Sequence, residues 1–215
     1  MNEKQTKEIG GGFIPEAPHP QRFSHTAVFG AIVKIPEFDF VVGENLRVKN
    51  QDVVSGSDLC TAYASSTVSE AQEEKELSPE YIFAKSKQIA GEWQSWGGTL
   101  DNVCKALTRF GTIEQNESPY ELAKNGRDFV ANWENWGLEY DEKARKHLKE
   151  AYFEADGPYD VFDNIRAALW HYRDEKRLVL TGAIWRREWV YASGGQISEQ
   201  YGNNGFGHAF AIKGV

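Results

Sequence analysis

The chain has 215 residues, of which 40% are hydrophobic, 13% aromatic and 26% charged. This composition predicts a folded globular protein and argues against extensive disorder, and the length fits one domain or two lobes around one core. The 32 acidic residues outnumber the 24 basic ones and give a net charge of −8, so we expect neither nucleic acid nor an anionic membrane as a partner.

Neither a signal peptide nor a membrane span is expected. The N-terminal sequence MNEKQTKEIGGG is polar and has no apolar core. Purely apolar runs, such as residues 31–33, are far shorter than the roughly 18 to 20 residues of a transmembrane helix. The two cysteines, Cys60 and Cys104, are too few for a disulfide framework. We therefore expect a cytoplasmic protein, with packaging in a virion as an alternative.

The first 34 residues combine a glycine triplet at 10–12 with three prolines between 15 and 20 and show no sustained hydrophobic period. They are expected to form an extended arm on the surface. Ser57 and Asp58 are typical helix caps, and the small residues that follow predict a closely packed helix to about Lys75.

Two further helices follow in the first half of the chain. Ser78 and Pro79 suit the N-cap and the first position of a short helix. Apolar residues with a 3.6-residue period predict another helix from Thr99 to about Phe110, ended by Gly111. Cys104 lies on the apolar face of that helix, so we expect a buried, inert thiol.

The second half changes from helical to strand-like patterns. Weak helical character near residues 141–152 precedes a clearer helix at 160–172. Strands are expected at 178–185 and 208–212, with a glycine-rich loop at 194–207 between them. Helices come early and strands late, without alternating β-α-β units, which favours an α+β fold over a doubly wound sheet.

Cys60 and His208 are the candidates for chemistry. Cys60 falls in the first turn of a predicted helix, where the helix dipole stabilises a thiolate, so we expect a low pKa. His208 begins an apolar strand directly after a mobile-looking glycine-rich loop. A purely structural role stays an alternative for each. His147 and His171 lie among charged residues and are expected to be exposed. No His or Cys spacing fits a metal site.

Several segments, in order, resemble landmarks of papain-like cysteine peptidases. They are residues 35–39 (IPEFD), 48–51 (VKNQ), 60–65 (CTAYAS), 77–80 (LSPE), Gly97-Gly98, 110–111 (FG), 118–120 (SPY) and 207–212 (GHAFAI). His208 lies 148 residues after Cys60, and that family separates its cysteine and histidine by about 130 to 150 residues. The arm around residues 12–18 resembles propeptide-less members from bacteria and their viruses.

The resemblance implies a fold, an activity and a set of site residues. It implies an α+β two-lobe fold, with a helical left lobe at about 50–125 and a barrel-like right lobe at about 126–215. Cys60 would be the nucleophile and His208 the general acid and base. Gln51 would donate to the oxyanion, and Gly97 and Gly98 would pair with an extended peptide. The expected reaction is hydrolysis of a peptide or protein substrate through a thioester, without a cofactor or metal.

Two departures from that family pattern limit the expectation. Gln51 precedes Cys60 by nine positions, more than in papain itself. The family also carries an asparagine beyond the histidine, which has no counterpart in the seven residues after His208, so we expect a domain that lacks its last strands and is weakly active. Alternatives are a catalytically silent peptide-binding or virion protein and a Cys-His acyl transferase. The oligomeric state stays open.

Overall fold

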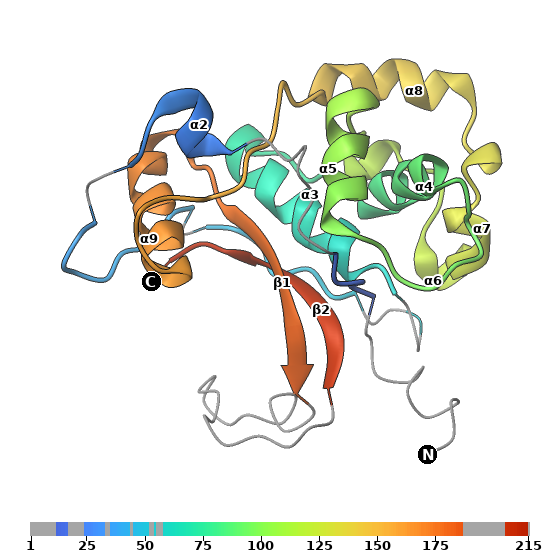
Figure 1. The fold of residues 1–215 in the computed structure, drawn as a ribbon. Helices are drawn as coiled ribbons and strands as arrows, with labels where there is room; N and C mark the ends of the chain where they lie inside the picture. The colour runs from blue at the N-terminus through green and yellow to red at the C-terminus, as the bar shows by residue number, and fades with distance from the viewer. Residues whose placement is uncertain are drawn as a thin grey trace.

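The computed structural model describes residues 12–16, 24–32, 35–43, 45–51, 54, 58–186 and 205–214. A central helix, α3 (Cys60–Glu73), has further helices on one side and a β-hairpin on the other (Figure 1). The hairpin joins β1 (Val179–Arg186) to β2 (Gly205–Ile212) in antiparallel register, and helix α9 (Val161–His171) lies beside it. The central helix therefore separates a helical side from a side that carries the hairpin.

The helical side begins as the sequence predicts. Helix α4 (Pro79–Ala90) has Ser78 as its N-cap, whose hydroxyl accepts a hydrogen bond from the Tyr81 amide at 3.2 Å. In α5 (Leu100–Arg109), Thr99 accepts from the Asn102 amide at 3.1 Å. Gly111 follows with a left-handed φ of 78°, the conformation that stops a helix most readily at glycine.

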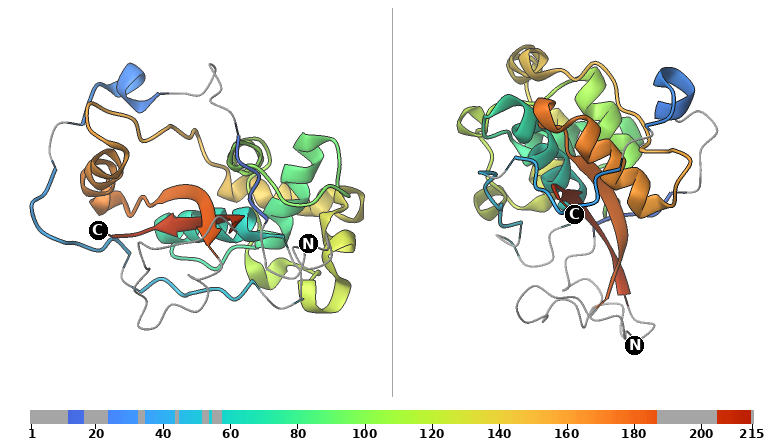
Figure 2. Two further views of the ribbon diagram at one scale, coloured as in Figure 1. Left: turned by 60° about the horizontal axis from the view of Figure 1, so that its bottom comes forward. Right: turned by 90° about the vertical axis from the view of Figure 1, so that its left-hand side faces the viewer.

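The remaining elements are short. They are α2 (His25–Phe29), η1 (Gln115–Glu117), α6 (Leu122–Asn125), α7 (Arg127–Ala131), η2 (Trp133–Asn135), α8 (Leu138–Ala144), η3 (Arg145–His147) and η4 (Arg173–Glu175). The helix expected near residues 141–152 thus lies earlier and is shorter. Figure 2 shows two further views of the same arrangement, in which the hairpin lies against α3.

The main apolar core lies where α3, α4 and α5 meet. Fully buried Leu59, Ala62, Phe83 and Val103 pack together there, which fits the small-residue face predicted for α3. A second core forms around Trp136, whose ring packs edge-on against Tyr81 at 5.3 Å. Smaller clusters join α3 to the hairpin, so the position of Cys60 is fixed from both sides.

Two expectations about this fold are corrected. The hairpin strands form where they are expected, but among the described residues the sheet has only these two strands and is not a barrel. His147 is buried rather than exposed, because it contacts the Glu73 carboxylate together with Lys149. That carboxylate at the end of α3 contacts both side chains, which ties the segment after α8 to the central helix.

No helix in the described residues is long and apolar enough to cross a lipid bilayer.

Candidate active site

Cys60 is the first residue of α3 and is only 1% exposed. It is a free thiol, as is Cys104, which is half-buried on α5. The Cys60 side chain packs with Ala64 of its own helix, with Ala209 of β2 and with Phe13. The central helix, the hairpin and the N-terminal segment therefore meet at this thiol.

The expected low pKa of Cys60 is wrong for this state of the protein. Burial is the largest effect and raises the pKa of the thiol to about 11, and the charge of Asp58 adds to the rise. Backbone hydrogen bonds with Ala209, Gly12 and Thr61 lower the pKa but only partly offset burial. The favourable helix dipole cannot compensate for removing a thiolate from water, so the sulfur is protonated at neutral pH.

The segment Gly12–Glu16 covers the thiol in an extended conformation. The Phe13 amide donates to the Gly207 carbonyl at 3.2 Å, and the Ile14 amide donates to the Gly98 carbonyl at 2.8 Å. In return the Gly98 amide donates to the Gly12 carbonyl at 2.6 Å. The segment therefore lies between the loop before α5 and strand β2 and is paired with both.

Gly12 sits so close to the start of α3 that no side chain fits there. A Cβ atom at position 12 would lie well inside van der Waals distance of the Asp58 carbonyl oxygen. The ring of Phe13 occupies the space next to Gly182 of β1, and the backbone carbonyl of Phe13 lies against Gly207 of β2. The absence of side chains on both partners is what allows the segment to lie against the site.

The glycines proposed as a peptide-binding edge lie beside the residues that flank Cys60. A Cβ atom at Gly98 would be 2.9 Å from the hydroxyl of Thr61, and the Gly97 amide donates to the buried Asp58 carboxylate. The edge is thus next to Cys60. Its role in binding a substrate stays a prediction.

His208 lies on β2, directly before Ala209, whose backbone contacts the Cys60 thiol. Strand β2 begins at Gly205, three residues earlier than expected. The imidazole lies among aromatic rings, 5.4 Å from the Trp185 ring and 6.3 Å from the Phe206 ring between centroids. The structure brings the histidine strand to the cysteine, while the proton-transfer role of His208 stays a prediction.

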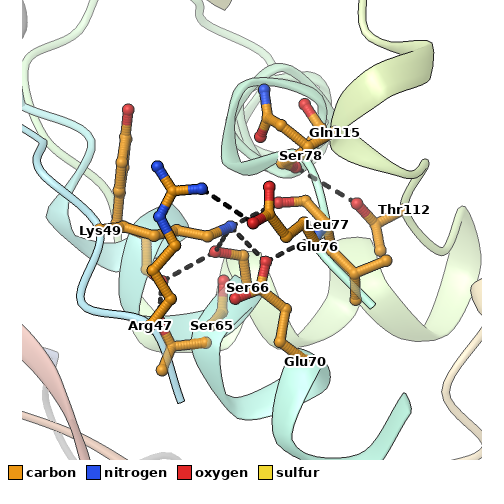
Figure 3. Close-up of polar contacts among 12 residues, drawn as sticks. Arg47, Lys49, Ser65, Ser66, Glu70, Glu76, Leu77, Ser78, Thr112 and Gln115 are labelled. Atoms are coloured by element: carbon orange, nitrogen blue, oxygen red, sulfur yellow. Dashed lines mark hydrogen bonds and ion pairs between the residues drawn. The ribbon is translucent and has the colours of Figure 1, made fainter. Parts of the chain in front are cut away.

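Gln51 lies on a segment that the half-buried Lys49 fastens to the core. Lys49 donates to the Leu77 carbonyl at 2.6 Å and forms an ion pair with Glu70, which itself accepts from the Leu77 amide at 2.6 Å (Figure 3). Gln51 follows two residues later and is half-buried. Of the residues that connect it to Cys60, 52, 53 and 55–57 lie outside the described part of the chain, so its oxyanion role stays a prediction.

Asp58 is the residue that the sequence interpretation misjudged. It does not cap α3, because the N-cap is Leu59 and no side chain caps that helix. Asp58 instead forms a bidentate ion pair with Arg127, with nitrogen–oxygen distances of 3.0 and 3.1 Å. Arg127 lies 69 residues downstream, and no sequence pattern connects two positions so far apart.

In the described ranges no group of three His, Cys, Asp or Glu side chains is placed to hold a metal ion.

The arrangement has a known structural counterpart. Xylellain, a cysteine protease from Xylella fastidiosa, superimposes with a TM-score of 0.74 over 96% of this chain and 80% of its own, at 18% sequence identity. The two proteins share a fold. No family model matches this chain, and no curated protein matches it by sequence. The likeness supports the papain-like fold expected from the sequence in its coarse form, a mixed helix and sheet architecture.

Proposed function

We propose that this chain is a cysteine peptidase in which Cys60 is the nucleophile, His208 the general acid and base, and Gln51 an oxyanion donor. The observation that carries the proposal is the extended segment Gly12–Glu16, which pairs with Gly98 over the thiol. A site that holds an extended backbone next to a cysteine at a helix start can hold a substrate peptide in the same way.

The proposed reaction follows from these groups. The Cys60 thiol gives its proton to His208, and the sulfur attacks the peptide carbonyl carbon. The carbon–nitrogen bond breaks, His208 protonates the leaving amine, and a thioester joins the acyl group to Cys60. Water then adds to the thioester as His208 takes its proton, which releases the acid and restores the thiol. Gln51 and the Cys60 amide would stabilise the oxyanion of each tetrahedral intermediate.

The described state is a closed one. Because Gly12 and Phe13 cover Cys60 and burial raises the pKa of the thiol, a substrate can reach the sulfur only after the segment moves away. Opening would return water to the thiol, so burial would no longer outweigh the helix dipole and the pKa of the thiol would fall. We therefore propose that the N-terminal segment and a peptide substrate compete for the same edge.

A catalytically silent protein that binds peptides is the second candidate. The neutral, covered thiol of Cys60 favours it, since such a site needs the peptide-binding edge but no reactive sulfur. Cleavage of peptides distinguishes the peptidase from the silent peptide-binding protein. Extended peptides should be cleaved by the chain after its segment is displaced, and the Cys60→Ala variant should bind them without cleaving them.

The lobe boundaries belong to the same proposal. We place a left lobe at about 50–125 and a right lobe at about 126–215, and the N-terminal arm of residues 1–34 joins the right lobe.

A further inference from the structure

Three buried charged side chains surround the loop of residues 93–98, which precedes α5. Asp58 is 0% exposed, Lys87 is 2% exposed and the Arg127 side chain is 9% exposed. They come from three different elements: the turn before α3, helix α4 and helix α7. Buried charges are costly unless each is paired and hydrogen-bonded, so the bonds that they form indicate what this cluster holds in place.

Arg127 connects the turn before the nucleophile to the loop. Besides its bidentate pair with Asp58, it donates to the Trp93 carbonyl at 2.9 Å and to the Ser95 carbonyl. A guanidinium group is a rigid, planar fork, so these four contacts fix the loop relative to Asp58 in orientation as well as in distance.

Lys87 and Asp58 together hold both polar backbone groups of Gly97. Lys87 donates to the Gly97 carbonyl and also to the carbonyl and hydroxyl of Ser95, at 2.6 and 3.1 Å. Asp58 accepts from the Gly97 amide. Burial lowers the pKa of Lys87 to about 8. Keeping this side chain charged in the buried position therefore costs free energy even with these partners.

Gly98, the residue after Gly97, has a backbone amide and carbonyl that can pair with an extended strand. With Gly97 bound to the cluster on both sides, the amide and carbonyl of Gly98 pair with Gly12 and Ile14. Asp58 is also only two residues before Cys60. The same carboxylate therefore lies between the proposed nucleophile and the edge on which an extended chain lies.

We propose that Asp58, Arg127 and Lys87 are positioning residues that hold the Gly97–Gly98 edge at a fixed distance and orientation from Cys60. A peptide on that edge then presents its carbonyl group to the sulfur. This assignment rests on the proposed peptidase function for its substrate, but the positioning itself concerns the edge and the extended segment seen on it. A merely structural ion pair would affect stability alone.

Arg127→Gln in the full chain tests the positioning without catalysis. It removes the contacts to Trp93 and Ser95, so the edge and the segment paired with it should loosen, and iodoacetamide should alkylate Cys60 about tenfold faster. Loss of the guanidinium leaves Asp58 uncompensated, which disfavours a nearby thiolate and would by itself slow the reaction. Faster alkylation therefore reports on access rather than on charge.

The matched control is Lys85→Gln. Lys85 is as buried as Lys87, lies on the same helix and pairs with Asp141 rather than with the loop. This control should lower the melting temperature while leaving Cys60 alkylation within twofold of the unchanged chain. Lys87→Met, which removes the bond to the Gly97 carbonyl and leaves the Asp58–Arg127 pair, should accelerate alkylation as Arg127→Gln does. Lys87→Met also tests the positioning proposal if Arg127→Gln does not fold.

Kinetics in the Gly12→Ala chain give the second readout. Arg127→Gln should raise KM about tenfold for an extended peptide. The peptide kcat and the turnover of p-nitrophenyl acetate should both change less than that, because this small ester does not reach Gly98. The KM of the Arg127→Lys chain should fall between the values for the chain with Arg127 and the Arg127→Gln chain. Unchanged alkylation in both Arg127→Gln and Lys87→Met, or equal losses for peptide and ester, would overturn the proposal. If no peptide is cleaved at all, the peptidase function fails while the alkylation result still judges the positioning.

Discussion

A methyl group added at position 12 tests whether close packing of Gly12 keeps the site closed over Cys60. Gly12→Ala adds a methyl group that would overlap the Asp58 carbonyl oxygen. Overpacking typically costs about 1–3 kcal/mol, so the segment should leave the site more often and Cys60 should be alkylated about tenfold faster or more. Pro15→Ala is the control, because Pro15 is an exposed residue of the same segment. Equal rates in Gly12→Ala and the unchanged chain would mean that Gly12 does not gate the thiol.

The Cys60 thiol also predicts how stability depends on pH. Its pKa is raised from an ordinary 9.0 to about 11 by burial, so the folded state holds its proton more tightly than the unfolded state. The stabilisation is complete below pH 9 and is lost as the pH rises through 11. Relative to Cys60→Ala, the free energy of unfolding should fall by about 2 kcal/mol over this interval. Urea titrations at several pH values measure it, and a flat difference would contradict the burial argument.

Glu73 tests how the end of α3 is fastened to the segment after α8. Burial opposes ionisation of this carboxyl, but hydrogen bonds and charges from Lys149 and His147 outweigh it and lower its pKa below the ordinary 4.5. A depressed carboxyl pKa stabilises the fold above pH 4.5, and this contribution disappears as the pH falls through the folded value.

Glu73→Gln should therefore lower the free energy of unfolding at pH 7 by about 1 kcal/mol, the size of a partly exposed charged contact. Denaturant titrations should show the difference between the two proteins shrinking in acid. Glu142→Gln is the control, because Glu142 is an exposed residue of α8 and its substitution should change little. A loss that is equally large at low pH would show that the carboxylate charge is not what matters.

Local sequence signals predicted most of the elements. Ser78, Thr99 and Gly111 act at helix ends through contacts within a few residues, and the apolar runs around 180 and 209 form the expected pair of strands. Contacts distant in sequence were not predictable. Asp58 looked like a helix cap and instead binds Arg127, and His147 looked exposed until Glu73 supplied a buried partner. The error at Cys60 has the same origin, because Gly12 covers it from 48 positions away.

At the scale of the whole molecule, the site depends on three parts that meet at one thiol. Helix α3 supplies Cys60, the hairpin supplies Ala209 and the adjoining His208, and the N-terminal segment closes over Cys60. The mixed architecture shared with a cysteine protease places these parts at the start of the central helix. We therefore expect access to the thiol and hydrolysis of peptides to change together when the segment is displaced.

The most direct test of this account is cleavage of extended peptides by the 215-residue Gly12→Ala chain, followed by mass spectrometry. The account predicts new peptide termini, an acyl-enzyme on Cys60, faster turnover than by the unchanged chain, and no cleavage by the Gly12→Ala/Cys60→Ala double variant. Incorporation of an added amine in place of water would indicate an acyl transferase. Intact peptides in the presence of a freely alkylated Cys60 would contradict the proposed function.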